Sequence, residues 1–537
     1  ATRVFNVQFV SVDCILIECS VWKKSMIKKQ ITAQAAAELI NCGDTVTIAG
    51  FVGVGVPDEI LLALENRFKE HSKPTDLTLL FAAAPGDGKD RGLNRLAHAG
   101  MLRRTIGGHY GLAPKLGKLA TSGEIQAYNF PQGVISHMYR DIAAGKPGTL
   151  TRVGIDTFVD PRIEGGKINK QTIEDLVEVV TISGEEMLFY KTHKVDVAII
   201  RGTSADADGN ISMEREALRI DNLSQAMAAK NSGGVVIAQV ERIVPAKTLS
   251  PRMVEVPSAM IDAIVLAKPE NHVQTYGTVY SPYLDGQDRA PSQKIEITPL
   301  DARKVIARRT ALELPFDGGV VNLGIGVPEG VAMVASEQNW LEAVTLTAEP
   351  GVIGGQPSSG LDFGTAVNTD VIITQSQQFD FYDGGGLALA VLGMAEISIM
   401  GDVNVSRFGS RLPGAGGFIN ISQSAQKVIF CGTFTAGGLK TSIEDGKLVI
   451  LKEGSSTKFI RAVQQVTFSG QRAVSQSTPI LYVTERCVFE LRPEGLALIE
   501  IAPGIDLEND ILAQMDFRPV IGDVKQMDRR IFQSELM

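Results

Sequence analysis

The sequence is poor in cysteine. Its five cysteines are scattered over 537 residues, and no two of them have the Cys-x-x-Cys spacing of a zinc or redox site. We therefore expect no bound metal, and this cysteine usage fits a reducing, cytoplasmic compartment best. No apolar run in the sequence is long enough to cross a bilayer, so no membrane anchor is predicted.

The sequence also lacks an excess of basic residues. Its 52 lysines and arginines are outnumbered by 61 aspartates and glutamates, which gives a formal net charge of −9. An acidic chain has no general attraction for nucleic acid or for an anionic membrane, so neither is expected as a partner. A polyanionic ligand would have to bind through local basic residues or through helix N-termini.

Histidine is absent from the second half of the chain. All six histidines lie within the first 272 residues. A Ser-His-Asp site built entirely within the second half is therefore disfavoured. Chemistry in that half fits better with a side chain that needs no histidine base, such as a carboxylate that attacks directly.

Glycine, by contrast, is abundant, and it clusters in short loops that follow apolar runs. The 54 glycines separate segments that alternate between strand-like and helix-like patterns. This alternation predicts an α/β fold, with mainly parallel, open sheets and helices on both faces. The clearest strands are expected at 45–49, 77–83, 195–200, 235–240, 261–266 and 343–347, with helices at 33–41, 133–144 and from Asp301 onward.

The chain divides into four segments by composition. Residues 1–25 do not match the rest and are interpreted as a non-native or unassigned extension. We predict an N-terminal domain at 26–275, a polar linker at 276–299, and a C-terminal domain at 300–530. The linker belongs to a longer polar stretch that breaks the alternating pattern.

An internal repeat relates the two predicted domains. Gly-Val-Gly-Val-Pro at 53–57 resembles Gly-Ile-Gly-Val-Pro at 324–328, and each follows an apolar run and opens a helix. A weaker echo relates 208–211 to 400–403. Two similar α/β domains predict a ligand site between them. Each glycine loop can present backbone N–H groups to an anion, and the alternative is simply a tight strand-to-helix turn.

Glu349 stands where a buried strand runs into a glycine-rich loop, Glu-Pro-Gly-Val-Ile-Gly-Gly at 349–355. Pro350 keeps Glu349 out of helical geometry, and the glycines leave room for a ligand or another backbone. A lone carboxylate in this setting is suited to covalent chemistry. A helix cap or a solvated loop acid is the alternative from this window alone.

Two further stretches hold candidate groups. Gln132 precedes the helix expected at 133–144, where its amide can donate to a developing oxyanion. The loop at 407–417 combines Arg407 and Arg411 with several glycines, whose N–H groups can form the other half of an oxyanion hole. A long glycine-rich surface loop is the alternative there, and the same holds for the glycine loop at 381–386.

These motifs together resemble family I coenzyme A transferases in the form that joins both subunits in one chain. The resemblance is greatest to acetate and propionate CoA-transferases, including the acetyl-CoA:acetoacetate enzymes, and covers nearly all of 26–530. The motifs that carry it, by position, are 50–57, 107–111, 128–133, 157–162, 321–328, 349–355, 378–387, 414–420 and 482–491.

The resemblance implies roles for particular residues. The family nucleophile falls on Glu349, the oxyanion donors fall on Gln132 and on the backbone of Gly416 and Gly417, and no metal takes part. Coenzyme A contacts are implied or predicted at Asn322, Gly324, Gly326, Gly354, Gly385, Arg407 and Arg411. Pro350 departs from the family pattern, which often has Thr, Ser or Asn there, so acyl preference or rate is expected to shift.

The resemblance also implies a reaction. Glu349 would exchange coenzyme A between a short-chain acyl-CoA and a free carboxylate (acetate, acetoacetate, propionate or butyrate) through a glutamyl-CoA thioester, with ping-pong kinetics. Coenzyme A and acyl-CoA would be substrates, with no tightly bound cofactor, and the enzyme would be a homo-oligomer, a dimer or tetramer. The alternatives are an acyl-CoA hydrolase on the same fold and a non-catalytic ligand sensor.

Overall fold

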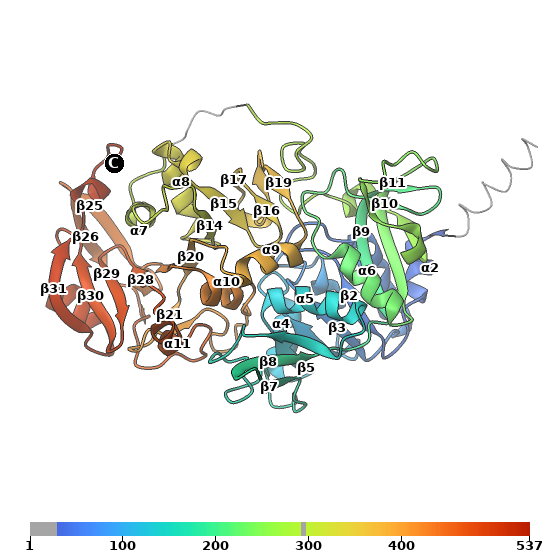
Figure 1. Cartoon of the computed structure of the whole chain (residues 1–537), viewed down its shortest axis with the longest axis horizontal. Helices are drawn as coiled ribbons and strands as arrows, with labels where there is room; N and C mark the ends of the chain where they lie inside the picture. Colours follow the sequence, from blue (N-terminus) through green and yellow to red (C-terminus); the bar gives the residue numbers. More distant parts are fainter. Residues whose placement is uncertain (1–28, 292–296) are drawn as a thin grey trace, which may run out of the picture.

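A computed structural model describes residues 29–291 and 297–537. The extension predicted at 1–25 lies outside the described residues, as do five residues of the linker predicted at 276–299. The two halves of the chain lie side by side along the long axis of the molecule (Figure 1). Within the described residues, no helix is both long enough and apolar enough to span a membrane.

A ten-stranded sheet organises the N-terminal half, and eight of its strands follow one path. Except for the antiparallel pairings of β10 (Ile211–Ser212) with β9 and with β12 (Val254–Val256), neighbouring strands run parallel. The path, in spatial order, is β1 (Gln30–Ile31), β13 (Ala263–Leu266), β11 (Val235–Val244), β9 (Val197–Asp206), β2 (Thr45–Ile48), β3 (Leu77–Phe81), β4 (Leu102–Gly107) and β5 (Gln126–Asn129).

Helices cover both faces of this sheet and bury two separate apolar cores. They are α2 (Ala33–Glu38), α3 (Asp58–His71) and α4 (Pro114–Ser122) on one face, with α5 (Gln132–Ala143) and α6 (Asn222–Asn231) on the other. Thr32 caps α2 by accepting a hydrogen bond from the Ala35 N–H at 3.1 Å, as the sequence predicts. Helix α5 begins at Gln132 itself, one residue earlier than predicted.

A second ten-stranded sheet organises the C-terminal half, and it is mixed: the strands in its middle run parallel, and so do the last two strands at one edge. At one end β15 pairs antiparallel with β16, and at the other β28, β29 and β30 are antiparallel. The path is β19 (Val371–Ile372), β16 (Val352–Ile353), β15 (Thr345–Ala348), β14 (Val320–Leu323), β20 (Leu389–Gly393), β23 (Val428–Cys431), β28 (Ile480–Val483), β29 (Cys487–Arg492), β30 (Gly495–Ile501) and β31 (Val520–Gln526).

Helices also cover both faces of the second sheet. They are α7 (Ala302–Ala311) and α8 (Glu329–Glu337) on one face, with α9 (Gln375–Asp383), α10 (Phe418–Ser424) and α11 (Gly470–Ser475) on the other. Asp301 caps α7 through the Lys304 N–H at 2.9 Å, which confirms the helix start predicted there. In Figure 1, α9 and α10 meet α5 where the two halves adjoin.

The strand order confirms the internal repeat. In the first sheet β2 lies between β3 and β9, followed outward by β11 and β13; in the second, β14 lies between β15 and β20, followed by β23 and β28. The repeated glycine loops each follow the central strand and lead into α3 or α8. The weaker echo also has a structural basis, since both copies lie in hairpins: residues 208–211 join β9 to β10, and residues 400–403 join β21 (Glu396–Ile397) to β22 (Val403–Asn404) after β20.

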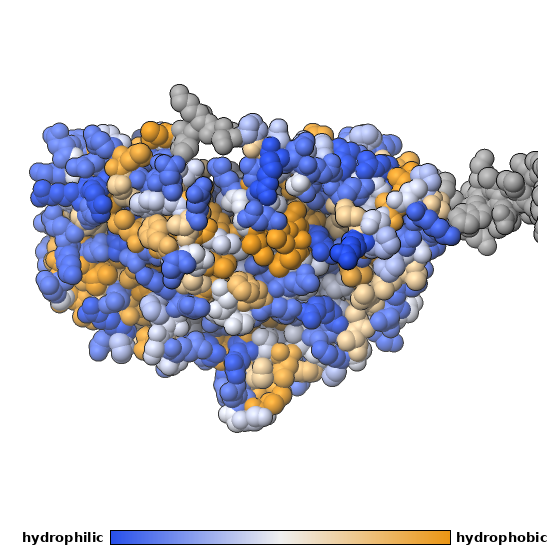
Figure 2. All heavy atoms as spheres, turned by 45° about the horizontal axis from the view of Figure 1, so that its top comes forward, coloured by the Kyte–Doolittle hydropathy of each residue, from blue (hydrophilic) through white to orange (hydrophobic). Residues whose placement is uncertain are grey.

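Smaller sheets of two or three strands accompany the two large sheets within the described residues. The largest consists of β6 (Gly148–Thr151), β8 (Glu185–Lys191) and β7 (Val177–Ile182), and it projects from the N-terminal half. Hydrophobic side chains reach the surface in this region, among them Ile182, which is 46% exposed. Elsewhere the face shown in Figure 2 mixes hydrophilic and hydrophobic side chains.

The predicted linker contacts both halves along its described part. The Tyr276 N–H donates to the Gly53 carbonyl at 2.8 Å in the N-terminal half. The Ala290 N–H donates to Asn368 Oδ1 at 2.7 Å in the C-terminal half. This polar segment therefore holds the two halves together by hydrogen bonds as well as joining them in sequence.

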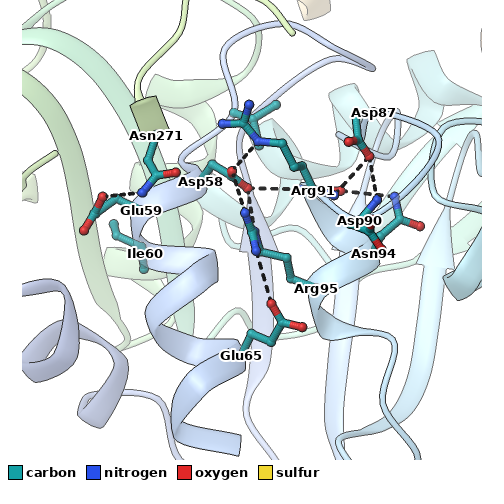
Figure 3. Close-up of polar contacts among 12 residues, drawn as sticks. Asp58, Glu59, Ile60, Glu65, Asp87, Asp90, Arg91, Asn94, Arg95 and Asn271 are labelled. Carbon is teal, nitrogen blue, oxygen red and sulfur yellow. Dashed lines mark hydrogen bonds and ion pairs between the residues drawn. The ribbon is translucent and has the colours of Figure 1, made fainter. Parts of the chain in front are cut away.

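A buried charge network fixes the start of α3 and with it the preceding glycine loop (Figure 3). Asp58 is 1% exposed; it accepts hydrogen bonds from Arg91 Nε at 2.8 Å, Arg95 Nε at 3.0 Å and the Gly92 N–H at 3.1 Å. Burial acts to raise the pKa of Asp58, but the hydrogen bonds and charges of Arg95 and Arg91 outweigh it and lower the pKa. Because folding lowers the pKa of Asp58, its ionised carboxylate stabilises the folded protein at every pH above the pKa of the unfolded chain.

Substitution of Asp58 by asparagine is expected to destabilise the protein by about 2 kcal/mol at pH 7, because the partly buried guanidinium groups of Arg91 and Arg95 lose a charged acceptor. Chemical denaturation measures the change. Glu70→Gln, at an exposed position on the same helix, is the control and should leave stability nearly unaltered. Equal stability of Asp58→Asn and the parent protein would contradict this account of the network.

Candidate active site

A cavity of about 220 Å³ lies between the two halves, and both contribute to its wall. Glu349 lines it together with the predicted residues Gln132, Asn322, Gly324, Gly416 and Gly417. The other lining residues are Phe51, Val52, Ala83, His109, Ile325, Phe363, Leu392, Gly393, Val405, Pro413, Gly414, Ala415, Phe418 and Ile421. The prediction of a site between the repeated domains thus has a matching cavity.

The strand topology explains why these residues meet. In the N-terminal half β2 lies between β3 and β9, and in the C-terminal half β14 lies between β15 and β20. The chain thus leaves each central strand toward opposite sides of the sheet, which opens a crevice at the carboxyl ends of the strands. Glu349 directly follows β15, Gly324 follows β14, and Gly393 ends β20. From the other half, Phe51 and Val52 come shortly after β2.

The loops after β15 and β3 also correspond in the two halves, but only the loop after β15 carries the carboxylate. Glu349-Pro350-Gly351 follows β15, whereas the similar tripeptide Ala84-Pro85-Gly86 comes soon after β3, the corresponding strand of the N-terminal half. Ala84, whose side chain is a methyl group, therefore occupies the position in the N-terminal half that Glu349 occupies in the C-terminal half. The site is asymmetric in chemistry, although its frame is repeated.

Burial dominates the electrostatics of Glu349. It raises the pKa of the side chain from 4.5 to about 7, opposed by hydrogen bonding from the backbone of Glu349 itself and from the Asn322 side chain. A carboxylate with such a pKa is poorly solvated and is therefore a better nucleophile than an acid in water. Both the neutral acid and the reactive anion are therefore accessible near neutral pH.

The floor beneath Glu349 is a chain of buried hydrogen bonds. Asn322 Nδ2 lies 3.3 Å from Tyr382 Oη, and the Tyr382 hydroxyl donates to Thr347 Oγ1 at 2.8 Å. Thr347 in turn donates to the Val321 carbonyl at 3.0 Å. The Asn322 Oδ1 atom is buried and has no hydrogen-bond partner among the described residues. Asn322 therefore has one acceptor without a partner, next to the cavity wall that this residue helps to form.

The opposite wall brings Gln132 to the glycine loop of the other half. The Gln132 N–H donates to the Gly416 carbonyl at 2.9 Å, and the Gly416 N–H donates to the Gly108 carbonyl at 2.8 Å. The Gly416 N–H is thus already engaged, whereas the Gly417 N–H has no acceptor among the described residues. Of the two glycines predicted as oxyanion donors, Gly417 is the one with a free donor.

Two glycines permit the close contact of the halves around the cavity. A Cβ atom at Gly53 would lie 2.2 Å from the Leu361 carbonyl oxygen, and one at Gly133 would lie 2.5 Å from Asn420 Nδ2. Any larger residue at either position would push the halves apart. These contacts explain why glycine occupies the loop after β2 and the second position of α5.

The apolar side of the cavity includes a strained turn. Val52 has a φ of +44°, a left-handed conformation that a β-branched residue rarely adopts. Its turn is closed by hydrogen bonds between Phe51 and Val54, and the Val52 carbonyl accepts from the Gly86 N–H at 2.8 Å. Phe51 and Phe363 stack with ring centroids 6.1 Å apart, so aromatic rings from both halves meet beside the cavity.

The remaining predicted coenzyme positions lie outside the cavity wall. Gly326 lines a separate surface pocket at the start of α8, and Gly354 packs against Asp370. Gly385 follows α9, and a Cβ atom there would meet open space. Arg407 Nη1 donates to the Ile168 carbonyl at 3.0 Å, and Arg411 is exposed. Their roles in coenzyme binding stay predictions.

His109 is a cavity residue to which sequence reasoning assigned no role. It is half-buried in the cavity wall, and this desolvation lowers its pKa to about 4, so it is a neutral imidazole in the cavity at physiological pH. The concentration of histidines in the N-terminal half does not keep them from the site, because both halves build it. The motif Gly-Gly-His-Tyr-Gly at 107–111 was the available signal.

Comparisons with known proteins agree on the class. The family model for coenzyme A transferase matches residues 29–267. The chain is 48% identical to caffeate CoA-transferase of Acetobacterium woodii over 94% of this chain and 98% of that protein. It therefore belongs to the coenzyme A transferase family and is a CoA-transferase of the single-chain type.

Acetate CoA-transferase YdiF of Escherichia coli K12 is also similar, at 41% identity over 94% of each chain. Two crystal structures of acyl-CoA transferase YdiF from E. coli O157:H7 share the fold. The apoenzyme has a TM-score of 0.90 at 40% identity, covering 95% of this chain and 96% of that one. A thioester complex with CoA has a TM-score of 0.89 at 39% identity, covering 95% and 97%.

Proposed function

We propose that the protein transfers coenzyme A between a short-chain acyl-CoA and a free carboxylate, with Glu349 as the covalent nucleophile. One observation carries this proposal: Glu349 lines an inter-domain cavity together with Gln132 and Gly417, in a setting that raises the pKa of its carboxyl group. The thioester complex described for YdiF supports the same chemistry for this chain.

In the first step, the Glu349 carboxylate attacks the thioester carbonyl of the acyl-CoA. A bond forms between the glutamate oxygen and the acyl carbon, the carbon–sulfur bond breaks, and coenzyme A leaves as a thiolate. The product on the enzyme is a mixed acyl-glutamyl anhydride. The Gln132 amide and the Gly417 N–H donate hydrogen bonds to the oxyanion of the tetrahedral intermediate. Both donors are already held in the cavity wall, so they need to move little when the negative charge develops.

In the second step, the thiolate attacks the glutamyl carbonyl of the anhydride. This forms an enzyme–CoA thioester and releases the first carboxylic acid as its carboxylate. A second carboxylate then runs both steps in reverse and leaves with coenzyme A, which restores Glu349. One thioester is exchanged for another, so no external energy source is needed, and the kinetics are ping-pong.

The cavity must also keep water from the two acyl intermediates. Its walls include Phe51, Val52, Phe363 and Leu392, whose apolar side chains offer water few hydrogen-bond partners. The same walls favour a small acyl group beside Glu349. We therefore propose acetate, propionate, butyrate and acetoacetate as the acids exchanged. Pro350, which packs beside Phe51 and Gly364, fixes the backbone at this wall.

Dependence on an acceptor acid tests this proposal. With acetyl-CoA as donor, we expect formation of a new acyl-CoA only when propionate, butyrate or acetoacetate is added, as followed by chromatography. Release of free coenzyme A without any acid would instead indicate a hydrolase. Exchange with caffeate but with none of the short acids would contradict the proposed substrate class, and the absence of any CoA adduct would favour a sensor.

The homo-oligomer, a dimer or tetramer, also stays a proposal. The exposed hydrophobic residues of the β6–β8–β7 sheet include Leu150 and Ile182, and such residues on a projecting sheet are compatible with subunit contacts. Light scattering of the purified protein determines its mass in solution. Each cavity draws its lining from the two halves of one chain, so the proposed chemistry does not depend on the outcome.

A further inference from the structure

A buried chain of side chains leads from the cavity to a carboxylate outside it. Gln132 Nε2 donates to Gln375 Oε1 at 2.9 Å, and Gln375 Nε2 donates to Asp221 Oδ2 at 2.6 Å. Gln132, Gln375 and Asp221 are all at most 2% exposed. Of the three, only Gln132 lines the cavity.

Asp221 has no basic side chain paired with it. None of the ion pairs among the described residues involves it, and its other oxygen accepts a hydrogen bond from Ser136 Oγ at 2.5 Å. The Gln375 N–H donates to the carbonyl of Ile220, a β-branched residue held at a φ of +53°. A buried acid without an ion pair, beside a strained turn, is costly, so its presence there points to a function.

An ionised carboxylate accepts hydrogen bonds and cannot donate them. Asp221 therefore requires the NH₂ end of the Gln375 amide, which turns the Gln375 oxygen toward Gln132. That oxygen in turn requires the NH₂ end of Gln132. The two ends of an amide have nearly the same shape, so packing alone does not select the flip.

We propose that Asp221, acting through Gln375, is a positioning residue that holds the Gln132 amide in the flip that presents nitrogen. One N–H of Gln132 Nε2 donates its hydrogen bond to Gln375 Oε1. The second N–H is then free to donate to the oxyanion. In the opposite flip an oxygen would occupy that place and repel the developing negative charge. This inference rests on the oxyanion role proposed for Gln132.

The position of Gln375 adds a second consequence. Gln132 and Asp221 belong to the N-terminal half, whereas Gln375 is the first residue of α9 in the C-terminal half. The chain of hydrogen bonds is therefore complete only when the two halves are packed together. The orientation of the Gln132 amide therefore depends on the contact between the two halves that form the cavity wall.

A double-mutant cycle tests the proposal. We expect Asp221→Asn to lower kcat about tenfold or more while the KM for acetyl-CoA changes less than about twofold, because the donor acts in the transition state. Gln132→Ala should lower kcat about 100-fold. In the Gln132→Ala background, Asp221→Asn should have almost no further effect on kcat, since the group it positions is gone.

Two other variants sharpen the cycle. Gln375→Met keeps the length of the side chain but removes its hydrogen bonds with Gln132, Asp221 and Ser136, so it should behave as Asp221→Asn does, and it serves if the latter does not fold. Asp206→Asn removes another buried carboxylate of the same half, one that accepts the Asn210 N–H at 2.8 Å and does not touch Gln375. It should alter stability and leave kcat unaltered.

The outcomes separate the inference from the function on which it rests. An equal loss of kcat from Asp221→Asn in the presence and absence of Gln132 would overturn the positioning role and leave Gln132 as a donor. A loss confined to KM would overturn it as well. Unchanged kcat in Gln132→Ala would overturn the oxyanion role of Gln132, and the positioning role with it.

Discussion

Replacement of Glu349 by glutamine is expected to lower CoA transfer by at least about 10⁴-fold, because the amide cannot form the covalent intermediate. The variant keeps the shape of the side chain, so the cavity and acyl-CoA binding should persist. Steady-state exchange between acetyl-CoA and propionate measures the loss, and tryptophan fluorescence or calorimetry measures retained binding of acetyl-CoA.

The matched control is Glu342→Gln, seven residues upstream at an exposed position. It makes the same chemical change on the same segment and should retain full activity. Transfer by Glu349→Gln at a rate near that of the parent protein would refute the assignment of the nucleophile. Full loss in both variants would indicate a folding effect instead.

The same substitution is expected to stabilise the protein at alkaline pH. Glu349 has a pKa of about 7 in the folded protein, against 4.5 for the unperturbed group. The folded state therefore binds more protons than the unfolded state between these values, and stability falls as pH rises from 4.5 to 7. At one pKa unit per 1.36 kcal/mol, the cost of the anion reaches about 3 kcal/mol above pH 7.

Glutamine mimics the neutral acid and avoids this cost. Glu349→Gln should therefore equal the parent protein in stability near pH 4.5 and exceed it by about 3 kcal/mol at pH 8. Denaturant titrations at both pH values provide the measurement, again with Glu342→Gln as control. A stability difference that does not depend on pH would show that the pKa of Glu349 is not raised by folding.

The position of Glu349 was accessible to sequence reasoning because its signals are local. An apolar run, an acid, a proline and three glycines within 343–355 define a strand end and an open turn. The repeat of the glycine-proline loops was also visible and correctly predicted a second, related sheet. The helices that follow Thr32, Pro57 and Asp301 were identified from capping residues and proline.

The partners of the site were not accessible in the same way. Gln375 meets Gln132 across 243 positions of sequence and Asp221 across 154. None of the three has a local pattern that reveals the contact, because tertiary packing alone brings them together. The placement of His109 in the cavity is not predictable from sequence for the same reason, since the cavity takes its lining from both halves of the chain.

The antiparallel part of the second sheet also escaped prediction. Strands β28, β29 and β30 are joined by short turns, and their side chains are buried over much of their length. Their apolar runs therefore resemble those of parallel strands that lie between helices. The short connections between these strands leave no room for a crossover helix, so neighbouring strands must run antiparallel. The regular alternation of strands and helices expected for the chain does not predict this arrangement.

The most direct test of the central claim is mass spectrometry of the protein after incubation with acetyl-CoA and reduction with borohydride. We predict that the peptide holding Glu349 loses mass, because reduction of a glutamyl thioester replaces the carboxyl group by a primary alcohol, with two hydrogens in place of one oxygen. Glu349→Gln should show no change. An unmodified Glu349 peptide from a protein that is fully active in CoA transfer would contradict the account.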